Sequence, residues 1–229
     1  MTVANIVLKQ FKLFCNLPDD IIAELSQYAQ LIDLPRRKVV MQKNQTAHSL
    51  GLLLSGRLQG VDMTLDGKEA GLYFIEPNDF FGELSVIDKL PAPEYIIAVS
   101  SAKIITIPAD IIRILITKSP TVSAIMSARL AHRLREAQAQ RTLLSMTSPL
   151  QRVSAQLLHL TLTSNKKDAS IADAPTHQEI AIMINTTRET VTRVFQTLQK
   201  KGLIKRDGRS LLVLNLKKLK VLATDTANI

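Results

Sequence analysis

Three kinds of hydrophobic pattern follow one another along the chain. Residues 1–30 place apolar side chains at helical spacing, and Pro18 opens the clearest segment of that pattern. From about residue 31 to 107 the apolar runs become short and are separated by turn residues, which predicts several strands. From Pro108 to about Pro149 the spacing is helical again. This order predicts an α+β protein in which helices flank a β-rich region.

The β-rich region contains short apolar runs at nearly regular spacing. Turn signals between them include Ser55-Gly56, Asp66-Gly67 and residues 77–79. Short strands of this kind predict an antiparallel sandwich or barrel, which either encloses a small ligand or is filled by its own side chains. The predicted strands are 38–41, 50–54, 55–60, 72–75, 96–99 and 104–107.

One long helix is predicted from near Pro120 to about Thr147, because this stretch holds no internal glycine or proline. At 1.5 Å per residue it is about 40 Å long, which exceeds what a small domain needs. Its apolar seam, interrupted by Arg141, suits a coiled-coil homodimer imperfectly, and the alternative is a linker helix packed on its own barrel. The seam consists of Leu130, Leu134, Ala137 and Leu144.

The stretch 176–202 predicts two helices joined by a tight turn. Asn185 lies where the turn needs a left-handed residue, Thr187 can cap the second helix, and Gly202 ends it. Each helix carries one apolar stripe, which is expected to pack against the other helix. The stripes are Ile180 and Ile184 on the first helix, and Val191, Val194, Phe195 and Leu198 on the second.

The outward face of the second helix carries candidate DNA-reading chemistry. Arg188, Glu189 and Arg193 lie near its start, where arginine can bond to guanine and glutamate can accept from the cytosine amine in the major groove. The alternative is a solvated charged face. Candidate contacts to the DNA backbone are Thr176, Gln178, Thr187, Thr192, Gln196, Lys200, Arg206 and Arg209.

The remaining C-terminal pattern completes a winged helix-turn-helix. A helix is predicted over about 150–163, directly after a hinge at Pro149. Asp207-Gly208 lies between two apolar runs and predicts a hairpin, whose basic tip can touch phosphate. We therefore expect an effector domain, a dimerisation helix and a DNA-binding domain over residues 1–119, 120–148 and 149–229.

Positive charge is concentrated in the predicted DNA-binding domain. The formal net charge is +9. Residues 1–148 carry 16 Lys and Arg against 14 Asp and Glu, whereas residues 149–229 carry 13 against 6. This distribution predicts double-stranded DNA as a partner. A membrane partner is not predicted, because no strongly amphipathic basic helix is apparent.

The single cysteine, Cys15, leaves no intramolecular disulfide and favours a cytoplasmic location. The first residues lack a signal-peptide pattern, and no apolar run approaches the roughly 20 residues of a membrane span. One thiol cannot hold an iron–sulfur cluster. The spacing of the acids and histidines indicates neither a metal site nor a catalytic constellation, so no enzymatic function is predicted.

A small barrel, a long helix and a winged helix-turn-helix together resemble the Crp/Fnr family of bacterial transcription regulators. The most specific match is Gln178-Glu179-Ile180 followed by residues 187–193. The resemblance implies that Arg188, Glu189 and Arg193 occupy the family's base-reading positions. It also implies a homodimer that reads a palindrome with TGTGA-like half-sites, with RNA polymerase as a further partner.

The resemblance also allows the family's cyclic-AMP pocket to be checked. Residues 80–84 match the opening of its phosphate cassette, and Glu83 corresponds to the acid that holds the ribose hydroxyl. The phosphate-binding Arg-Ser pair is replaced by Pro93 and Glu94, and the adenine-binding Thr-Ser pair by Ala137-Gln138. Proline offers no donor and glutamate repels phosphate, so control by cyclic AMP through this pocket is not expected.

The sequence leaves open whether the regulator responds to another small ligand or to none. A larger anionic nucleotide such as cyclic di-GMP remains an alternative, with Arg57, Lys68, Arg129, Arg133 and Arg135 as available cations. The candidate ligand pocket is formed by Gly82, Glu83, Leu84, Pro93, Glu94, Arg133, Ala137 and Gln138.

Overall fold

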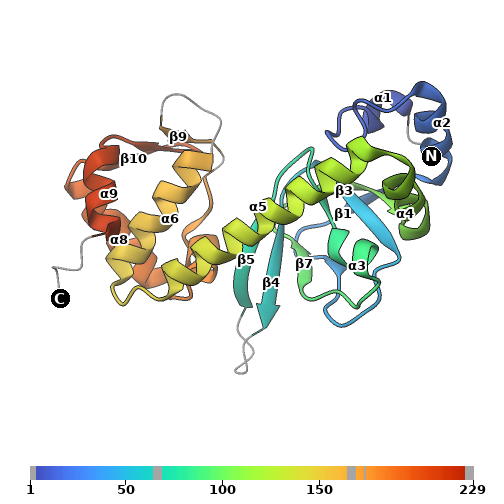
Figure 1. Cartoon of the computed structure of the whole chain (residues 1–229). Coiled ribbons are helices and arrows are strands. Elements are labelled where there is room, and N and C mark those ends of the chain that lie inside the picture. Colours follow the sequence, from blue (N-terminus) through green and yellow to red (C-terminus); the bar gives the residue numbers. More distant parts are fainter. Residues whose placement is uncertain (1–3, 64–68, 164–168, 173, 225–229) are drawn as a thin grey trace. The chain divides into compact units, whose positions relative to one another are not determined.

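The computed structural model describes residues 4–63, 69–163, 169–172 and 174–224. The chain divides into two compact units, one formed by most of the first 136 residues and one by the residues from Ala137 onward (Figure 1). The predicted turn at Asp66-Gly67 and the candidate cation Lys68 lie outside the described residues.

The first unit is built on two four-stranded sheets, which confirms the predicted antiparallel β architecture. The strand orders are β1-β8-β3-β6 and β2-β7-β4-β5, and β1, β3 and β7 pair antiparallel with each of their neighbours. The bounds are β1 (Gln30–Leu34), β2 (Val39–Met41), β3 (Ser49–Ser55), β4 (Leu58–Met63), β5 (Glu69–Ile75), β6 (Phe80–Phe81), β7 (Tyr95–Ala98) and β8 (Ala102–Pro108).

The two sheets together form a β-roll, and two apolar clusters stabilise it. The inner cluster joins the two sheets through side chains such as Leu53, Leu58 and Ile96. The outer cluster packs the other face of the first sheet against the helices, with Phe14 and Ile112 among its members. Alternate residues of β3 therefore point to opposite faces and are buried on both, which explains its nearly continuous apolar sequence.

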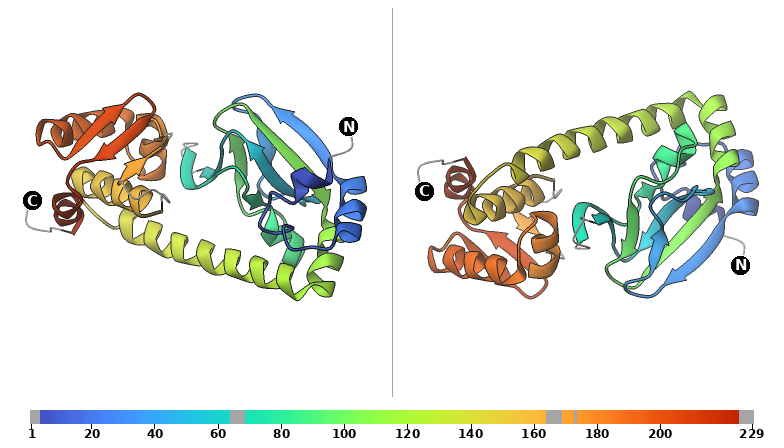
Figure 2. Two further views of the ribbon diagram at one scale, coloured as in Figure 1. Left: turned by 90° about the horizontal axis from the view of Figure 1, so that it is seen from above. Right: turned by 90° about the horizontal axis from the view of Figure 1, so that it is seen from below.

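Five helices accompany the β-roll in the described part of the chain. They are α1 (Asn5–Leu8), α2 (Asp19–Tyr28), α3 (Glu83–Asp88), α4 (Ala109–Lys118) and α5 (Pro120–Leu144). The long helix is confirmed as one continuous element, although it ends at Leu144 and not near Thr147 (Figure 2). The first 30 residues are not one helix, because turns separate α1 from α2.

The helices of the described chain were compared in length and apolar character with a membrane span. No single helix in the described ranges is long and apolar enough to cross a membrane. Helices α4 and α5 pass such a test only as a pair, which is bent by 111°. Their apolar residues Ile112, Leu115, Val122 and Met126 belong to the outer cluster of the β-roll.

The second unit is a winged helix-turn-helix, as predicted. Helices surround a small sheet of order β10-β11-β9. Two short elements, β9 and the last helix, were not expected from the pattern. The bounds are α6 (Pro149–Thr163), β9 (Ser170–Ile171), α7 (His177–Met183), α8 (Arg188–Lys200), β10 (Ile204–Asp207), β11 (Ser210–Val213) and α9 (Leu216–Thr224).

Candidate nucleic-acid interface and effector pocket

The helix-turn-helix is fixed by local hydrogen bonds. Thr176 caps α7 in a capping box, in which its hydroxyl accepts from the Glu179 amide and the Glu179 carboxylate accepts from the Thr176 amide. Asn185 takes φ 49°, which confirms the left-handed turn residue. Thr187 caps α8 by accepting from the Thr190 amide at 3.2 Å. Both caps begin their helices, and the left-handed residue Asn185 and the cap Thr187 lie where the sequence predicts them.

Two side chains from other helices bind the turn. Arg152 of α6 donates to the carbonyls of Ile184 and Asn185 at 2.9 and 3.1 Å. Gln140, near the end of α5, donates to the carbonyl of Met183. The C-terminal carbonyls of α7 lack partners within their own helix, so these donors satisfy groups that would otherwise be exposed to water or unpaired. Neither donor was predicted, because the contacts join distant parts of the sequence.

The predicted base-reading residues lie together on the outer face of α8. Arg188, Glu189 and Arg193 are all exposed. The pKa of Glu189 is lowered by a hydrogen bond from its own backbone amide, by Thr187, and by the nearby Arg188 and Arg193. Glu189 is therefore ionised at neutral pH and can only accept hydrogen bonds. Within the described ranges neither arginine forms a salt bridge, so both guanidinium groups are available to a ligand.

The predicted backbone contacts divide into two groups. Gln178, Gln196, Lys200 and Arg209 are exposed, as a contact to phosphate requires. The other four form hydrogen bonds inside the unit, and two of them, Thr176 and Thr187, are exposed as well. Thr176 and Thr187 cap helices, Thr192 donates to the Arg188 carbonyl at 2.9 Å, and Arg206 donates to the carbonyls of Ala174 and Pro175. Arg206 thus holds the wing against the segment that precedes α7.

His177 makes contacts that the sequence pattern did not predict. Its ring lies 4.4 Å from the Phe195 ring, and its Nδ1 is 2.9 Å from the Thr192 hydroxyl. Because that hydroxyl gives its proton to the Arg188 carbonyl, Nδ1 is the donor to Thr192. Burial lowers the pKa of His177, and the positive charges of Arg206 and Arg188 lower it further. A neutral histidine therefore links the two helices of the DNA-reading motif.

The candidate ligand pocket of the β-roll is occupied by a buried ion-pair network. Arg133 of α5 bonds to Glu83 Oε1 at 3.0 Å and to the two oxygens of Glu94 at 3.0 and 3.3 Å. Both glutamates are buried, and the Arg133 side chain is only 15% exposed. Sequence reasoning placed these three residues in one pocket, but it did not predict that Arg133 neutralises Glu94.

Tyr73 completes the coordination of Arg133. The guanidinium carbon lies 3.6 Å from the centre of the Tyr73 ring, and the Tyr73 hydroxyl donates to Glu94 Oε1. Gly60 makes room for this ring, since a Cβ there would lie 2.5 Å from it. Burial raises the pKa of Tyr73 well above its usual range, and the negative charge of Glu94 raises it further. The Tyr73 hydroxyl therefore keeps its proton.

A second arginine lies one helical turn earlier on α5. Arg129 bonds to Asp79 at 2.8 Å and to the Phe80 carbonyl at 3.3 Å, and its Nε is 3.8 Å from Glu83. Burial raises the pKa of Glu83, although Arg133 and Arg129 oppose that shift. Burial by itself lowers the pKa of Arg133, but Tyr73 and the two glutamates together raise it by more. The network therefore keeps Arg133 charged.

The other candidate pocket residues do not join the network. Pro93, Ala137 and Gln138 are exposed, and the last two belong to the second unit. Gly82 supplies the left-handed residue, φ 83°, that precedes α3. Leu84 is half-buried on that helix. In the described chain, the network included, no group of three or more His, Cys, Asp or Glu side chains could hold a metal ion.

Two family models match the chain. A cyclic nucleotide-binding domain covers residues 31–119, and a Crp-like helix-turn-helix domain covers residues 151–222. The chain belongs to the Crp/Fnr family of transcription regulators. The first match spans the β-roll with its ion-pair network, and the second spans the motif with the exposed face of α8. In a Crp/Fnr regulator these are the nucleotide-binding and DNA-binding modules.

Relatives and solved structures agree with this assignment. The chain is 27% identical over 210 residues to a CRP-like cAMP-activated global transcriptional regulator from Mycobacterium tuberculosis, covering 90% of this chain and 94% of that protein. It is 29% identical over 188 residues to the cyclic AMP receptor protein of Thermus thermophilus, covering 82% and 85%. FixK2 from Bradyrhizobium japonicum shares the fold, with a TM-score of 0.75, 19% identity, and coverage of 87% and 99%.

Proposed function

We propose that this Crp/Fnr regulator is a homodimer that reads a TGTGA-like palindrome with Arg188, Glu189 and Arg193. The observation that carries the proposal is the outer face of α8, where an ionised glutamate lies near two exposed arginines that form no salt bridge in the described chain. Arginine suits the O6/N7 edge of guanine, and glutamate suits the N4 amine of cytosine. Double-stranded DNA offers both groups in its major groove.

Contacts to phosphate would position α8 in that groove. Gln178, Gln196, Lys200 and Arg209 are exposed and polar or charged, and they are the residues that we assign to this task. Thr176, Thr187, Thr192 and Arg206 are proposed to act with them, while they also fix the helix starts and the wing. These contacts supply affinity that falls with salt, whereas α8 supplies the sequence preference.

Two faces of α5 support the proposed homodimer. At 100° per residue, Arg129 and Arg133 share the face that bonds to the β-roll, while Ala124, Ala131 and Leu134 lie on the opposite face. Leu134 is 62% exposed. Small side chains around an exposed leucine let a second helix approach closely. The predicted seam overlaps this face at Leu134, and a partner helix would cover it.

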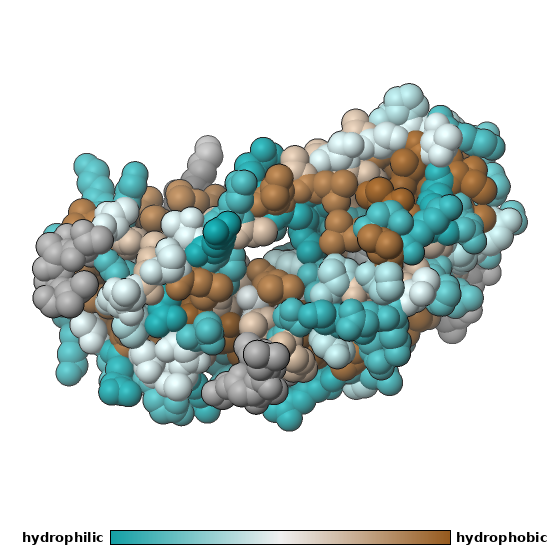
Figure 3. Space-filling view, turned by 60° about the horizontal axis from the view of Figure 1, so that its bottom comes forward, coloured by the Kyte–Doolittle hydropathy of each residue, from teal (hydrophilic) through white to brown (hydrophobic). Residues whose placement is uncertain are grey.

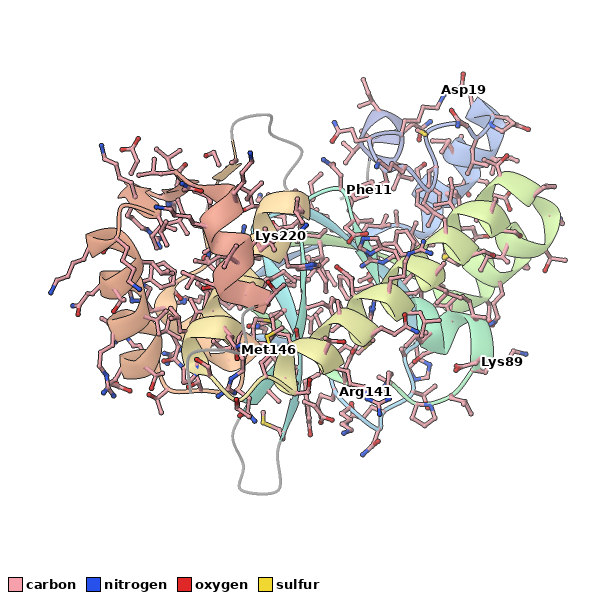
Figure 4. The ribbon with its side chains drawn as sticks, turned by 60° about the vertical axis from the view of Figure 1, so that its left-hand side comes forward. Phe11, Asp19, Lys89, Arg141, Met146 and Lys220 are labelled. Carbon is pink, nitrogen blue, oxygen red and sulfur yellow. The ribbon has the colours of Figure 1, made fainter. Side chains whose placement is uncertain are left out.

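Surface features of α5 are consistent with a partner. Of the predicted seam residues, Leu134, Ala137 and Leu144 are exposed and Leu130 is half-buried. Arg141, which interrupts the seam and is labelled in Figure 4, is also exposed. Apolar residues reach the surface in several places on the face drawn in Figure 3. A dimer also suits a palindromic site, since each protomer then reads one half.

The effector module is proposed to work without cyclic AMP, although relatives of the chain are named as cAMP-activated regulators. Arg133 is already bonded to two glutamates, and Arg129 to Asp79. A phosphate in this site would have to compete with buried carboxylates for guanidinium groups that are already neutralised. The alternative is a different small ligand, such as cyclic di-GMP, bound elsewhere on the same module.

The accompanying assignments follow the domain plan. We assign residues 1–119 to the effector domain, 120–148 to dimerisation and 149–229 to DNA binding. The regulator is proposed to act in the cytoplasm, with RNA polymerase as its protein partner and without enzymatic activity.

The test measures binding of the full chain to a TGTGA palindrome and to random duplex at about 150 mM salt, with and without cyclic AMP or cyclic di-GMP. We expect a preference of at least about 10³-fold for the palindrome without any nucleotide. Equal affinities for the two duplexes would refute sequence-specific reading. If the preference for the palindrome appears only with one nucleotide, base reading by α8 would stand, but DNA binding without a ligand would be refuted. Sedimentation of the free protein measures the expected dimer.

A further inference from the structure

We propose that Glu94 is a resident anion of the β-roll, a carboxylate of the chain itself that takes the position of a ligand's anionic group beside Arg133. The proposal rests on the proposed function only for its DNA-binding readout. It makes Glu94 the residue that decides ligand specificity in this module, and Arg133 the positioning residue through which α5 is attached to the β-roll.

The charges around Arg133 leave no place for a further anion. Asp79, Glu83 and Glu94 contribute three carboxylates, and Arg129 and Arg133 contribute two guanidinium groups. An added phosphate would raise the excess of negative charge in a buried site, where repulsion is poorly screened. Removal of the Glu94 carboxylate would leave equal numbers of acids and bases. The same site would then accept one small anion.

The geometry identifies Glu94 as the residue that fills the site. Its Oε1 accepts from both Arg133 Nη2 and the Tyr73 hydroxyl, and its Oε2 lies 3.3 Å from the same Nη2. These donors come from β5 and α5, two elements that no backbone pairing joins. A carboxylate that accepts from both therefore ties the helix to the sheet. Without it, Tyr73 and one side of Arg133 would be buried without an acceptor.

Attachment by a covalently linked anion does not depend on concentration. A free ligand occupies its site in proportion to its concentration, whereas Glu94 is held beside Arg133 by the fold itself. The helix that carries Arg133 continues to Leu144. The resident anion thus fixes the middle of that helix on the β-roll in every molecule, which predicts DNA binding that needs no nucleotide.

The first experiment is chemical rescue of Glu94→Ala, followed by thermal unfolding of the full chain. Loss of a buried partner is expected to lower Tm by about 6 °C or more. Acetate, which has the size of the deleted group, should raise the Tm of Glu94→Ala in a saturable manner, and chloride at equal ionic strength should not. Wild-type protein and Glu76→Ala, which removes the partly exposed partner of Arg57, should not respond specifically to acetate.

Each outcome of the rescue experiment either supports or overturns the assignment of Glu94 as the resident anion. A Tm for Glu94→Ala that equals that of Glu76→Ala, or that acetate does not raise, would overturn the proposal. If Glu94→Ala does not fold, a double-mutant cycle with Glu94→Gln and Arg133→Met replaces it. We expect the double variant to be clearly more stable than the sum of the single effects predicts, and additive effects would overturn the assignment.

DNA binding separates this proposal from the proposed function. Glu94→Ala should bind the TGTGA palindrome at least about tenfold more weakly than wild type, and acetate should restore its affinity. Unchanged DNA affinity in Glu94→Ala would overturn the regulatory role of the resident anion. If wild-type protein shows no sequence preference while acetate still rescues Tm, the proposed function fails and the resident anion stands. A rise in wild-type Tm with cyclic AMP would overturn the resident anion.

Discussion

Two helices of this regulator each present a pair of arginines, and the pairs are used in opposite ways. On α5, the side chains of Arg129 and Arg133 are only 13% and 15% exposed, and both are bonded to acids of the β-roll. On α8, Arg188 and Arg193 are exposed and, in the described ranges, form no salt bridge. The difference lies in the neighbours that the fold supplies. A buried guanidinium needs its counter-ion at all times, whereas an exposed one is solvated by water until a ligand replaces that water.

The comparison separates stability from recognition. Substitutions in the α5 network should change the free energy of unfolding, because they leave buried charge without a partner. Substitutions on the outer face of α8 should leave unfolding unchanged, because surface positions without packed neighbours contribute little to it. They should change DNA affinity instead. Each prediction below tests one side of this division.

The largest effect is expected for Arg133→Ala. It leaves Glu83 and Glu94 buried and facing each other without their common partner, which typically costs about 3–5 kcal/mol. Urea unfolding of the full chain measures the loss. Arg135→Ala, two residues away on the exposed side of α5, is the matched control and should change stability by less than about 0.5 kcal/mol. Similar losses in the two variants would break the distinction between buried and exposed arginines.

The next effect is expected for Arg193→Ala in the proposed reader. It removes one base contact and should cost about 1–3 kcal/mol on the cognate duplex while relaxing the preference at a single base pair. Competition binding against duplexes substituted at each half-site position measures this pattern. A uniform loss on every duplex would assign Arg193 to phosphate and not to a base. The urea midpoint of the variant should match that of wild type.

The sequence predicted the helix-turn-helix well because its determinants are local. Asn185, Thr187 and Gly202 act within one turn of their own positions, so their spacing alone predicted the helix ends. The same holds for the apolar stripe, of which Val191, Phe195 and Leu198 are buried as expected. Long runs and turn residues likewise predicted the strands and the long helix.

The family resemblance placed Glu83, Glu94 and Arg133 in one pocket, but the sequence could not predict the bonds between them or the part played by Tyr73, because the members of the network are dispersed. Tyr73, Glu94 and Arg133 come from distant positions, and no periodicity relates them. A glutamate in the position of a phosphate ligand indicated that phosphate is disfavoured, but the charge alone did not name its partner. Short elements were missed for a related reason. Helix α3 has six residues and β9 has two, too few to show a period.

A smaller effect is expected for Thr187→Ala at the start of α8. The substitution removes the side-chain acceptor of the Thr190 amide and should cost about 1 kcal/mol of stability. Thr187→Ser keeps the acceptor and is the matched control, which should lie close to wild type. Urea unfolding distinguishes the two. Equal losses in both variants would show that the methyl group, and not the cap, is what stabilises the helix.

The smallest effect is expected from titration of His177. Burial, followed by the charges of Arg206 and Arg188, holds the pKa of this histidine below its ordinary value of 6.5 in the folded protein. Below pH 6.5 the unfolded chain therefore binds this proton more readily than the folded chain. The contribution of His177 to stability is complete above that pH and is lost as the pH falls through the lower, folded pKa.

His177→Gln isolates this contribution. Glutamine does not titrate, and its amide can still donate to the Thr192 hydroxyl, the bond that His177 Nδ1 makes. We expect the urea midpoint of wild type to fall more steeply than that of the variant as the pH is lowered from 8 towards 5. Parallel pH dependences would show that the histidine is not shielded from protons by the fold. The link between the two helices of the reader would then tolerate a charge, as the exposed face of α8 does.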